Sequence, residues 1–221
     1  MSTYWESCQM TVEEIAAVAS LAGKSRIVGF QPEEVLTTEK LWSACCGLMG
    51  DGMLTQIDGK FRLNRELMAV MQPICQARSV VTLTPVSDLY AQLVLYNADT
   101  LTVMKKTPFG RIALTALAPK EGARMIADHM GLSEPEYLPE EEDLPPEITV
   151  NPGSSQQELL AGAQFLLERL DPETGVRTGW LRFVQQGVLS WLQWDEEEKI
   201  LCQPFTMQLL SRWLLQEEEK Q

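Results

Sequence analysis

The sequence predicts an α+β fold with two pseudo-symmetric subdomains, each an antiparallel sheet with helices, and an N-terminal winged-helix-like segment. The main observation is an internal repeat. Residues 91–130 have the pattern of strand, hairpin, strand, loop, strand and helix, and residues 178–216 repeat that order. Leu101 corresponds to Val188, an offset of 87 residues (188 − 101). The second observation is that capped helices and a hairpin precede the first copy.

Two capped helices open the chain. Thr11-Val-Glu-Glu14 has the pattern of a capping box, in which the two side chains accept each other's backbone N–H groups. Apolar residues at helical spacing follow, and Gly23 ends the helix. After an extended connector at residues 24–36, Thr37-Thr38-Glu39 starts a second helix.

A hairpin and a third helix complete the N-terminal segment. Asp58-Gly59 stands between alternating apolar residues, which is a strong signal for a two-residue β-turn. Asn64 can cap a helix that continues to Ala77, although Pro73 must kink or shorten it. Helix, hairpin and helix together resemble a winged-helix unit.

The first copy of the repeat follows. Apolar residues alternate from Val81 to Leu117, and Gly110 breaks the loop before the third strand of this copy. Pro119 takes the first position of a helix that Gly131 ends.

The second copy follows an acidic, proline-rich linker at residues 132–153. Ser154 or Ser155 is expected to cap a long helix that reaches Leu170, and three strands and a helix from Thr206 come next. The sequence therefore divides into an N-terminal lobe (1–131), the linker (132–153) and a C-terminal lobe (154–221).

Composition and charge narrow the possible functions. No window reaches the roughly 20 apolar residues of a membrane helix, and the first residues lack the pattern of a signal peptide, so we predict a cytoplasmic protein. The net charge is −13, and residues 131–221 carry 6 Lys and Arg against 18 Asp and Glu, mostly in runs at 140–143, 195–198 and 217–219. Such a surface repels nucleic acid and anionic membranes.

The sequence contains no recognisable arrangement of catalytic residues. Gly23-Lys24-Ser25 matches the end of a P-loop, but Val18 replaces its first glycine and a helix, not a strand, precedes it. His129 is the only histidine, and the five cysteines have no ligand spacing. We expect no enzyme activity, no cofactor and no metal.

A winged-helix DNA-binding regulator is the alternative function. Four basic residues surround the hairpin and the following helix, as a protein that binds in a DNA groove requires. They are Lys60, Arg62, Arg65 and Arg78. Four carboxylates lie among them: Glu39, Asp51, Asp58 and Glu66. Winged helices also serve as protein-interaction modules.

Five residues are candidates for binding a protein partner. Phe109 is an aromatic in the turn-like loop that begins with Thr107 and Pro108; it either contacts a partner or folds back onto the core. Trp191 and Trp194 differ by three positions along one strand, so their side chains point to opposite faces of the sheet. One of the two is therefore either covered by another layer or exposed to a partner.

The arrangement resembles the EspG substrate chaperones of type VII (ESX) secretion. The resemblance lies in residues 10–30 (MTVEEIAAVASLAGKSRIVGF), in residues 47–74, in the strands VVTLTP and RIALTAL, and in residues 179–215. It implies a pseudo-twofold pair of sheet-and-helix subdomains and a cytoplasmic, non-enzymatic chaperone or adaptor that binds a helical secretion substrate. A helical protein client is thus the expected partner, and a homodimer is left open.

Overall fold

The computed structural model describes residues 6–29, 36–86, 92–133 and 143–215 and shows an α+β fold. The chain forms two compact units. Unit 1 contains Met1–Val80, Leu93–Pro119 and Asp171–Gly175, and unit 2 contains Val81–Gln92, Lys120–Leu170 and Val176–Gln221. The lobe boundaries at 131 and 153 stay a prediction. Among the described residues, no helix has the length and apolar character needed to cross a membrane.

Unit 1 contains an antiparallel sheet in the order β1-β7-β6-β5. Its strands are β1 (Glu6–Met10), β5 (Leu93–Asn97), β6 (Leu101–Lys106) and β7 (Ile112–Leu117). The sequence did not predict β1. The strand β4 (Ser79–Pro85) begins in unit 1, where the backbone N–H of Arg78 donates to the carbonyl of Asn97 at 2.8 Å, and it ends in unit 2.

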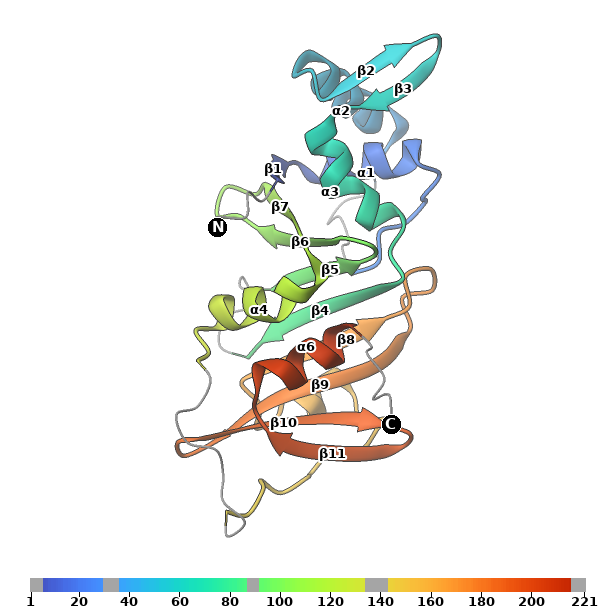
Figure 1. The fold of residues 1–221 in the computed structure, drawn as a ribbon. Coiled ribbons are helices and arrows are strands. Elements are labelled where there is room, and N and C mark those ends of the chain that lie inside the picture. The colour runs from blue at the N-terminus through green and yellow to red at the C-terminus, as the bar shows by residue number, and fades with distance from the viewer. Residues whose placement is uncertain (1–5, 30–35, 87–91, 134–142, 216–221) are drawn as a thin grey trace. The chain divides into compact units, whose positions relative to one another are not determined.

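Three helices and a hairpin complete unit 1 (Figure 1). They are α1 (Val12–Leu21), α2 (Thr38–Gly50), the strands β2 (Leu54–Ile57) and β3 (Lys60–Leu63), and α3 (Arg65–Cys75). The predicted capping box of Thr11 and Glu14 is confirmed, and Asn64 caps α3 by accepting from the N–H of Leu67. The buried hydroxyl of Thr102 donates to the carbonyl of Val70 at 2.9 Å, so α3 is bound to the sheet through β6.

Unit 2 contains an antiparallel sheet in the order β8-β9-β10-β11 with helices on both of its faces. Its elements are α4 (Gly122–Met130), which follows the 3-10 turn η2 (Pro119–Glu121), α5 (Gln156–Leu160), β8 (Phe165–Leu170), β9 (Arg177–Gln186), β10 (Leu189–Glu196), β11 (Lys199–Pro204) and α6 (Met207–Leu215). In Figure 1, α6 lies in front of these strands. The guanidinium of Arg169 lies 4.3 Å from the ring centre of Trp213, and α6 also packs against α4.

The internal repeat predicted from the sequence is confirmed. Strands β5, β6 and β7 with α4 have the same order as β9, β10 and β11 with α6. Each copy also has one more strand at its start, β4 in the first and β8 in the second.

The long helix predicted over residues 154–170 is wrong. Ser155 caps α5 as expected, but α5 ends at Leu160, and Gly162 at φ +73° turns the chain into β8. The first four residues of β8 are all buried, so this strand has a continuous apolar run instead of an alternating one. Such a run does not distinguish a strand from a buried helix.

The end of the predicted linker belongs to unit 2 and packs against the core of that unit. Val150 contacts the buried cluster of Leu159, Leu166 and Trp180, and the carbonyl of Pro152 accepts from the indole N–H of Trp180 at 3.3 Å. This end of the predicted linker is therefore part of a packed core rather than a free connection. Residues 134–142 of the linker and the acidic run at 217–219 lie outside the described residues.

Candidate functional site

The candidate site is the turn between β6 and β7 in unit 1, residues 105–111, which we call the β6–β7 tip. Pro108 holds the second position of the turn, and the N–H of Gly110 donates to the carbonyl of Thr107 at 3.1 Å. Gly110 has φ +73°, a left-handed conformation that favours glycine. The N–H and hydroxyl of Thr107 both donate to the carbonyl of Arg111, at 2.8 and 3.0 Å. These bonds fix the conformation of the turn.

Arg111 fastens this turn to the rest of unit 1. Its guanidinium donates to the carbonyl of Gln9 in β1 at 2.8 Å and lies 3.5 Å from a carboxylate oxygen of Glu14 in α1. The same carboxylate accepts from the N–H of Thr11 in the capping box at 2.7 Å. The tip is thus tied to both the edge strand and the first helix of the unit.

Phe109 points away from the core. Its side chain is 90% exposed, the largest value among the large hydrophobic side chains that the structure describes. Of the two alternatives for this residue, folding back onto the core is therefore excluded. Pro108 is also exposed, and Thr107 is half-buried. Partner binding by these three residues is a proposal, which we develop below.

Basic residues that the sequence reasoning missed flank Phe109. Lys105, Lys106 and Arg111 are all exposed, and residues 100–119 contain no Asp or Glu. These three basic residues give this stretch a net positive charge in a chain whose net charge is −13. The local positive charge can be read directly from the sequence, but a net charge summed over a whole lobe does not reveal it.

The two candidate tryptophans are core residues. Trp191 is 4% and Trp194 is 7% exposed, so neither presents a surface to a partner here, and we leave both out of the site. Of the two alternatives for this pair, coverage by another layer is correct. Trp194 lies on the sheet face of Leu181, its register partner in β9, and Trp191 lies on the opposite face with Trp180.

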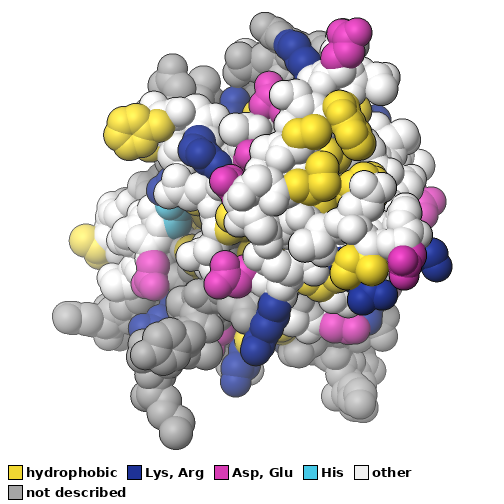
Figure 2. All heavy atoms as spheres, turned by 90° about the horizontal axis from the view of Figure 1, so that it is seen from above, with side chains coloured by type: hydrophobic (Ala, Val, Ile, Leu, Met, Phe, Trp, Pro, Cys, Tyr) yellow, Lys and Arg dark blue, Asp and Glu magenta, His cyan; other side chains and the backbone are white. Residues whose placement is uncertain are grey.

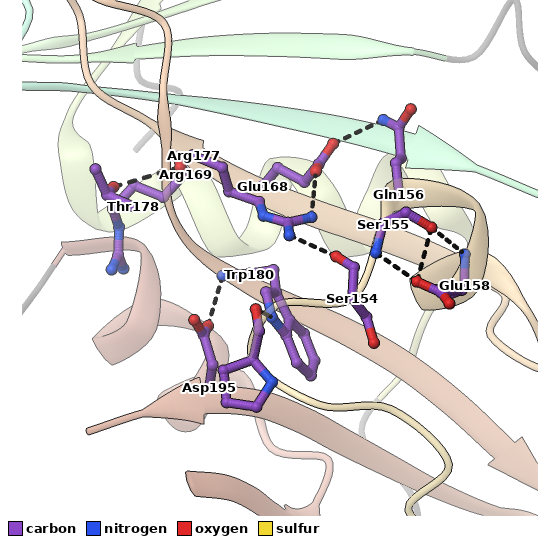
Figure 3. A network of polar contacts seen from close by, with 11 residues as sticks. Ser154, Ser155, Gln156, Glu158, Glu168, Arg169, Arg177, Thr178, Trp180 and Asp195 are labelled. Atoms are coloured by element: carbon purple, nitrogen blue, oxygen red, sulfur yellow. Dashed lines mark hydrogen bonds and ion pairs between the residues drawn. The ribbon is translucent and has the colours of Figure 1, made fainter. Parts of the chain in front are cut away.

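A polar network holds the second layer on the face of Trp180 (Figure 3). The carboxylate of Glu168 in β8 accepts from Gln156 of α5 at 2.7 Å and from Arg177 of β9 at 3.2 Å. Arg177 also donates to the carbonyl of Ser154. On the same face, buried Arg182 donates to Gln193 at 2.8 Å. The contacts of Glu168 and Arg177 hold α5 and Ser154 over this face of the sheet.

Asp195 of β10 also belongs to this network. Its carboxylate accepts from the backbone N–H of Trp180 at 2.7 Å. Burial raises the pKa of Asp195, although this hydrogen bond and the charges of Arg177 and Arg169 oppose that effect. The group therefore fixes β10 to β9.

The winged-helix-like segment has a surface of mixed charge. Lys60, Arg62 and Arg65 are exposed, and Arg78 forms an ion pair with Asp99. Figure 2 looks onto the end of the molecule that is uppermost in Figure 1, where α2 and the β2–β3 hairpin lie. It shows acidic and basic side chains interspersed around a group of hydrophobic ones. The exposed large hydrophobic residues of these elements and of α3 are Trp42, Ile57 and Met68.

The described part of the chain contains free thiols and no cluster suited to a metal ion. Its five cysteines are free thiols, and burial, followed by the charges of Glu66 and Glu14, raises the pKa of Cys8 to about 11. A thiol with that pKa is a poor nucleophile at neutral pH. Within the described ranges, no group of three or more His, Cys, Asp or Glu side chains could hold a metal ion.

No protein-family model matches the chain, and no curated protein matches it. Among solved structures, it is similar to the Mycobacterium tuberculosis type VII secretion system chaperone EspG5 in complex with a PE25–PPE41 dimer. The similarity covers 94% of this chain and 94% of that chain, with a TM-score of 0.45 and 11% sequence identity.

Proposed function

We propose that this protein is a non-enzymatic chaperone or adaptor that docks its β6–β7 tip on an apolar surface of a helical client protein. The observation that carries the proposal is Phe109, an aromatic side chain that is 90% exposed on a turn held by its own hydrogen bonds. Aromatic side chains are typical anchors of protein interfaces. The resemblance of the sequence to secretion chaperones favours the same class of function.

The conformation of the tip favours binding. Because Pro108, Gly110 and the bonds of Thr107 already fix the turn, docking orders little additional chain. Full burial of a phenylalanine side chain contributes about 1.5–3 kcal/mol, which gives a weak and reversible contact unless a rim of other contacts supports it. A chaperone of this kind lowers the population of free client by mass action.

A co-purification experiment with a matched control tests the proposal. Tagged wild type, Phe109→Ala and Val188→Ala are expressed in the native host, purified and analysed by mass spectrometry. Val188 is the control because it is also a hydrophobic residue on a tight hairpin turn, is 86% exposed and belongs to unit 2. Both substitutions remove only exposed apolar surface, so the fold is expected to tolerate them.

We expect wild type and Val188→Ala to recover one helical protein at near-equal stoichiometry, and Phe109→Ala to lose it. Equal recovery by all three proteins would show that the tip is not the docking site. Recovery of nucleic acid in place of a protein would contradict the chaperone function and favour the winged-helix alternative around Lys60, Arg62 and Arg65.

A further inference from the structure

We infer that the outer edge of β11 in unit 2 binds an extended segment of a partner protein, with basic residues beside the β10–β11 turn. The partner segment adds to the sheet as one more strand. This site uses other residues than the β6–β7 tip, so the inference does not rest on the proposed function. It is carried by the backbone of β11 and by the charge of the turn before it.

The strand β11 is paired on one side only. Among the described strands it pairs with β10 alone, and it is the last strand of its sheet (Figure 1). Lys199 lies opposite Glu196 of β10 across the two-residue turn, so these two residues exchange backbone hydrogen bonds. Bonded pairs alternate along an antiparallel ladder, and the N–H of Phe205 donates to a β10 carbonyl at 2.8 Å in the same phase. The N–H and C=O groups of Ile200 and Cys202 therefore point away from β10.

Side chains on both faces of β11 can contact a partner strand. Ile200, Leu201 and Cys202 are each only half-buried, and Ile200 contacts the buried cluster formed by α5, β8 and β9. Consecutive residues of a strand point to opposite faces, so a further strand would cover apolar surface on both. Lys199 and Pro204, two residue types that limit pairing at sheet edges, stand only at the ends of β11. The middle of the strand is therefore open to pairing.

The edge strand of unit 1 is protected in a way that β11 is not. The guanidinium of Arg111 donates to the carbonyl of Gln9 in β1 at 2.8 Å, so a side chain occupies a backbone group of that edge. Among the described residues, no side chain bonds to the backbone of Ile200 or Cys202. Extended peptides add to sheets at edges of this kind.

Three carboxylates favour a basic partner segment. Glu196, Glu197 and Glu198 are exposed, and none of them belongs to an ion pair in the described part of the chain. Lys199 offsets only one of the three charges. Opposite charges on neighbouring strands stabilise their pairing, so Lys or Arg at this end of the partner segment would strengthen binding.

Other occupants fit this edge less well. The acidic runs of the chain itself, at 140–143 and 217–219, carry the wrong charge. A second copy would bring a net charge of −13 and its own Pro204, which has no N–H to donate. Nucleic acid would be repelled by the same carboxylates. An extended segment with basic residues at one end is therefore the occupant that we propose.

Three synthetic peptides of about nine residues test this inference. The first alternates valine and threonine and ends in lysines, which antiparallel pairing with β11 places beside the β10–β11 turn. The second has glutamine in place of each lysine. The third is the lysine peptide with N-methyl groups on the alternate residues that would donate to β11, so it cannot pair.

The protein variants separate backbone pairing from charge. Cys202→Pro removes an outward N–H without removing a hydrogen bond to β10. Cys202→Ala is its matched control, because it loses the same thiol and keeps the N–H. Glu196→Gln/Glu197→Gln/Glu198→Gln removes charge at three exposed positions, and Phe109→Ala tests for binding at the β6–β7 tip. Fluorescence anisotropy measures binding in 0.05 and 0.5 M salt, and urea unfolding of each variant verifies that the fold is retained.

We expect wild type, Cys202→Ala and Phe109→Ala to bind the lysine peptide with equal affinity. Cys202→Pro should bind it about ten-fold more weakly, because it loses a backbone donor and its ring obstructs the partner strand. The N-methylated peptide should not bind. The triple glutamine variant and 0.5 M salt should each lower the affinity for the lysine peptide about five-fold, to that of the glutamine peptide.

Equal binding of the lysine and glutamine peptides to wild type would refute the preference for a basic segment. Edge pairing is refuted if no peptide binds, or if the N-methylated peptide binds as tightly as its parent. That comparison uses the unaltered protein, so it decides the question even if Cys202→Pro does not fold. Loss of binding in Phe109→Ala would place the peptide at the β6–β7 tip instead. A wild-type dimer in sedimentation that Cys202→Pro abolishes and Cys202→Ala retains would assign the edge to a second copy.

Discussion

The β10–β11 turn makes a stability prediction, because two glutamates adopt a conformation that favours glycine. Glu197 and Glu198 are the central residues of a two-residue hairpin turn, with φ of +48° and +65°. These values correspond to a type I′ turn, for which Asn-Gly and Asp-Gly are the preferred pairs. The β2–β3 turn of the same chain has that preferred pair, Asp58-Gly59, at φ of +51° and +72°.

We predict that Glu198→Gly stabilises the protein. A residue with a Cβ in the left-handed region costs about 1–2 kcal/mol, and glycine removes this strain. Glycine also increases the conformational entropy of the unfolded chain, which offsets about 0.5–1 kcal/mol of the gain. The expected net increase in the free energy of unfolding is about 0.5–1 kcal/mol.

Two further variants isolate the backbone effect. Gly59→Glu introduces the same strain into the β2–β3 turn, where an added Cβ would meet no atom within 4 Å, so its expected loss of about 0.5–1 kcal/mol is conformational. Glu198→Gln removes the charge at the β10–β11 turn but keeps the strain. Urea unfolding followed by circular dichroism should show shifts in the midpoint at constant slope. The reasoning is refuted if Glu198→Gln gains as much as Glu198→Gly, or if Glu198→Gly loses stability.

Three other substitutions test a buried hydrogen bond, a buried carboxylate and a helix cap. Tyr96→Phe removes the buried hydrogen bond to the carbonyl of Val28 and should lower the free energy of unfolding at pH 7 by about 1–2 kcal/mol. Burial raises the pKa of Tyr96 above its ordinary value of 10.0, so the folded state keeps this proton at a pH where the unfolded chain releases it. The free energy of unfolding of wild type should therefore fall above about pH 10. Urea midpoints should show a smaller fall in Tyr96→Phe. Asp195→Asn keeps an acceptor for the N–H of Trp180 and removes a carboxylate whose pKa burial raises. Because a raised carboxyl pKa makes stability fall as the pH rises above about 4, the asparagine variant should be at least as stable as wild type at pH 7, and a lower midpoint would contradict this. Thr11→Ala breaks the capping box of α1 and should destabilise by about 1 kcal/mol in thermal unfolding, whereas Thr11→Ser should not.

The sequence predicted the elements whose signals are local. The capping residues Thr11, Asn64 and Ser155, the Asp58-Gly59 turn and the end of α4 at Gly131 are all where they were expected. Each depends on a few neighbouring residues and their backbone conformation. The repeat was also predictable, because its strands and helix follow one another in the same order in both copies.

Elements that depend on the tertiary environment were not predictable. The prediction of a helix over β8 is wrong because the sheet is covered on both faces there, which removes the alternation of a half-exposed strand. The same coverage explains why both Trp191 and Trp194 are buried, which strand periodicity alone could not decide. For the candidate site, the sequence identified Phe109 as unusual, but its exposure depends on the bonds of Thr107 and Arg111.

Site-specific photo-crosslinking in the native host tests the docking function most directly. A photoreactive phenylalanine analogue replaces Phe109 in one sample and Val188 in the other, and the crosslinked products are identified by mass spectrometry. We predict one helical protein crosslinked at position 109 and not at position 188. The same products at both positions, or none at position 109, would contradict the conclusion that the β6–β7 tip docks on a client.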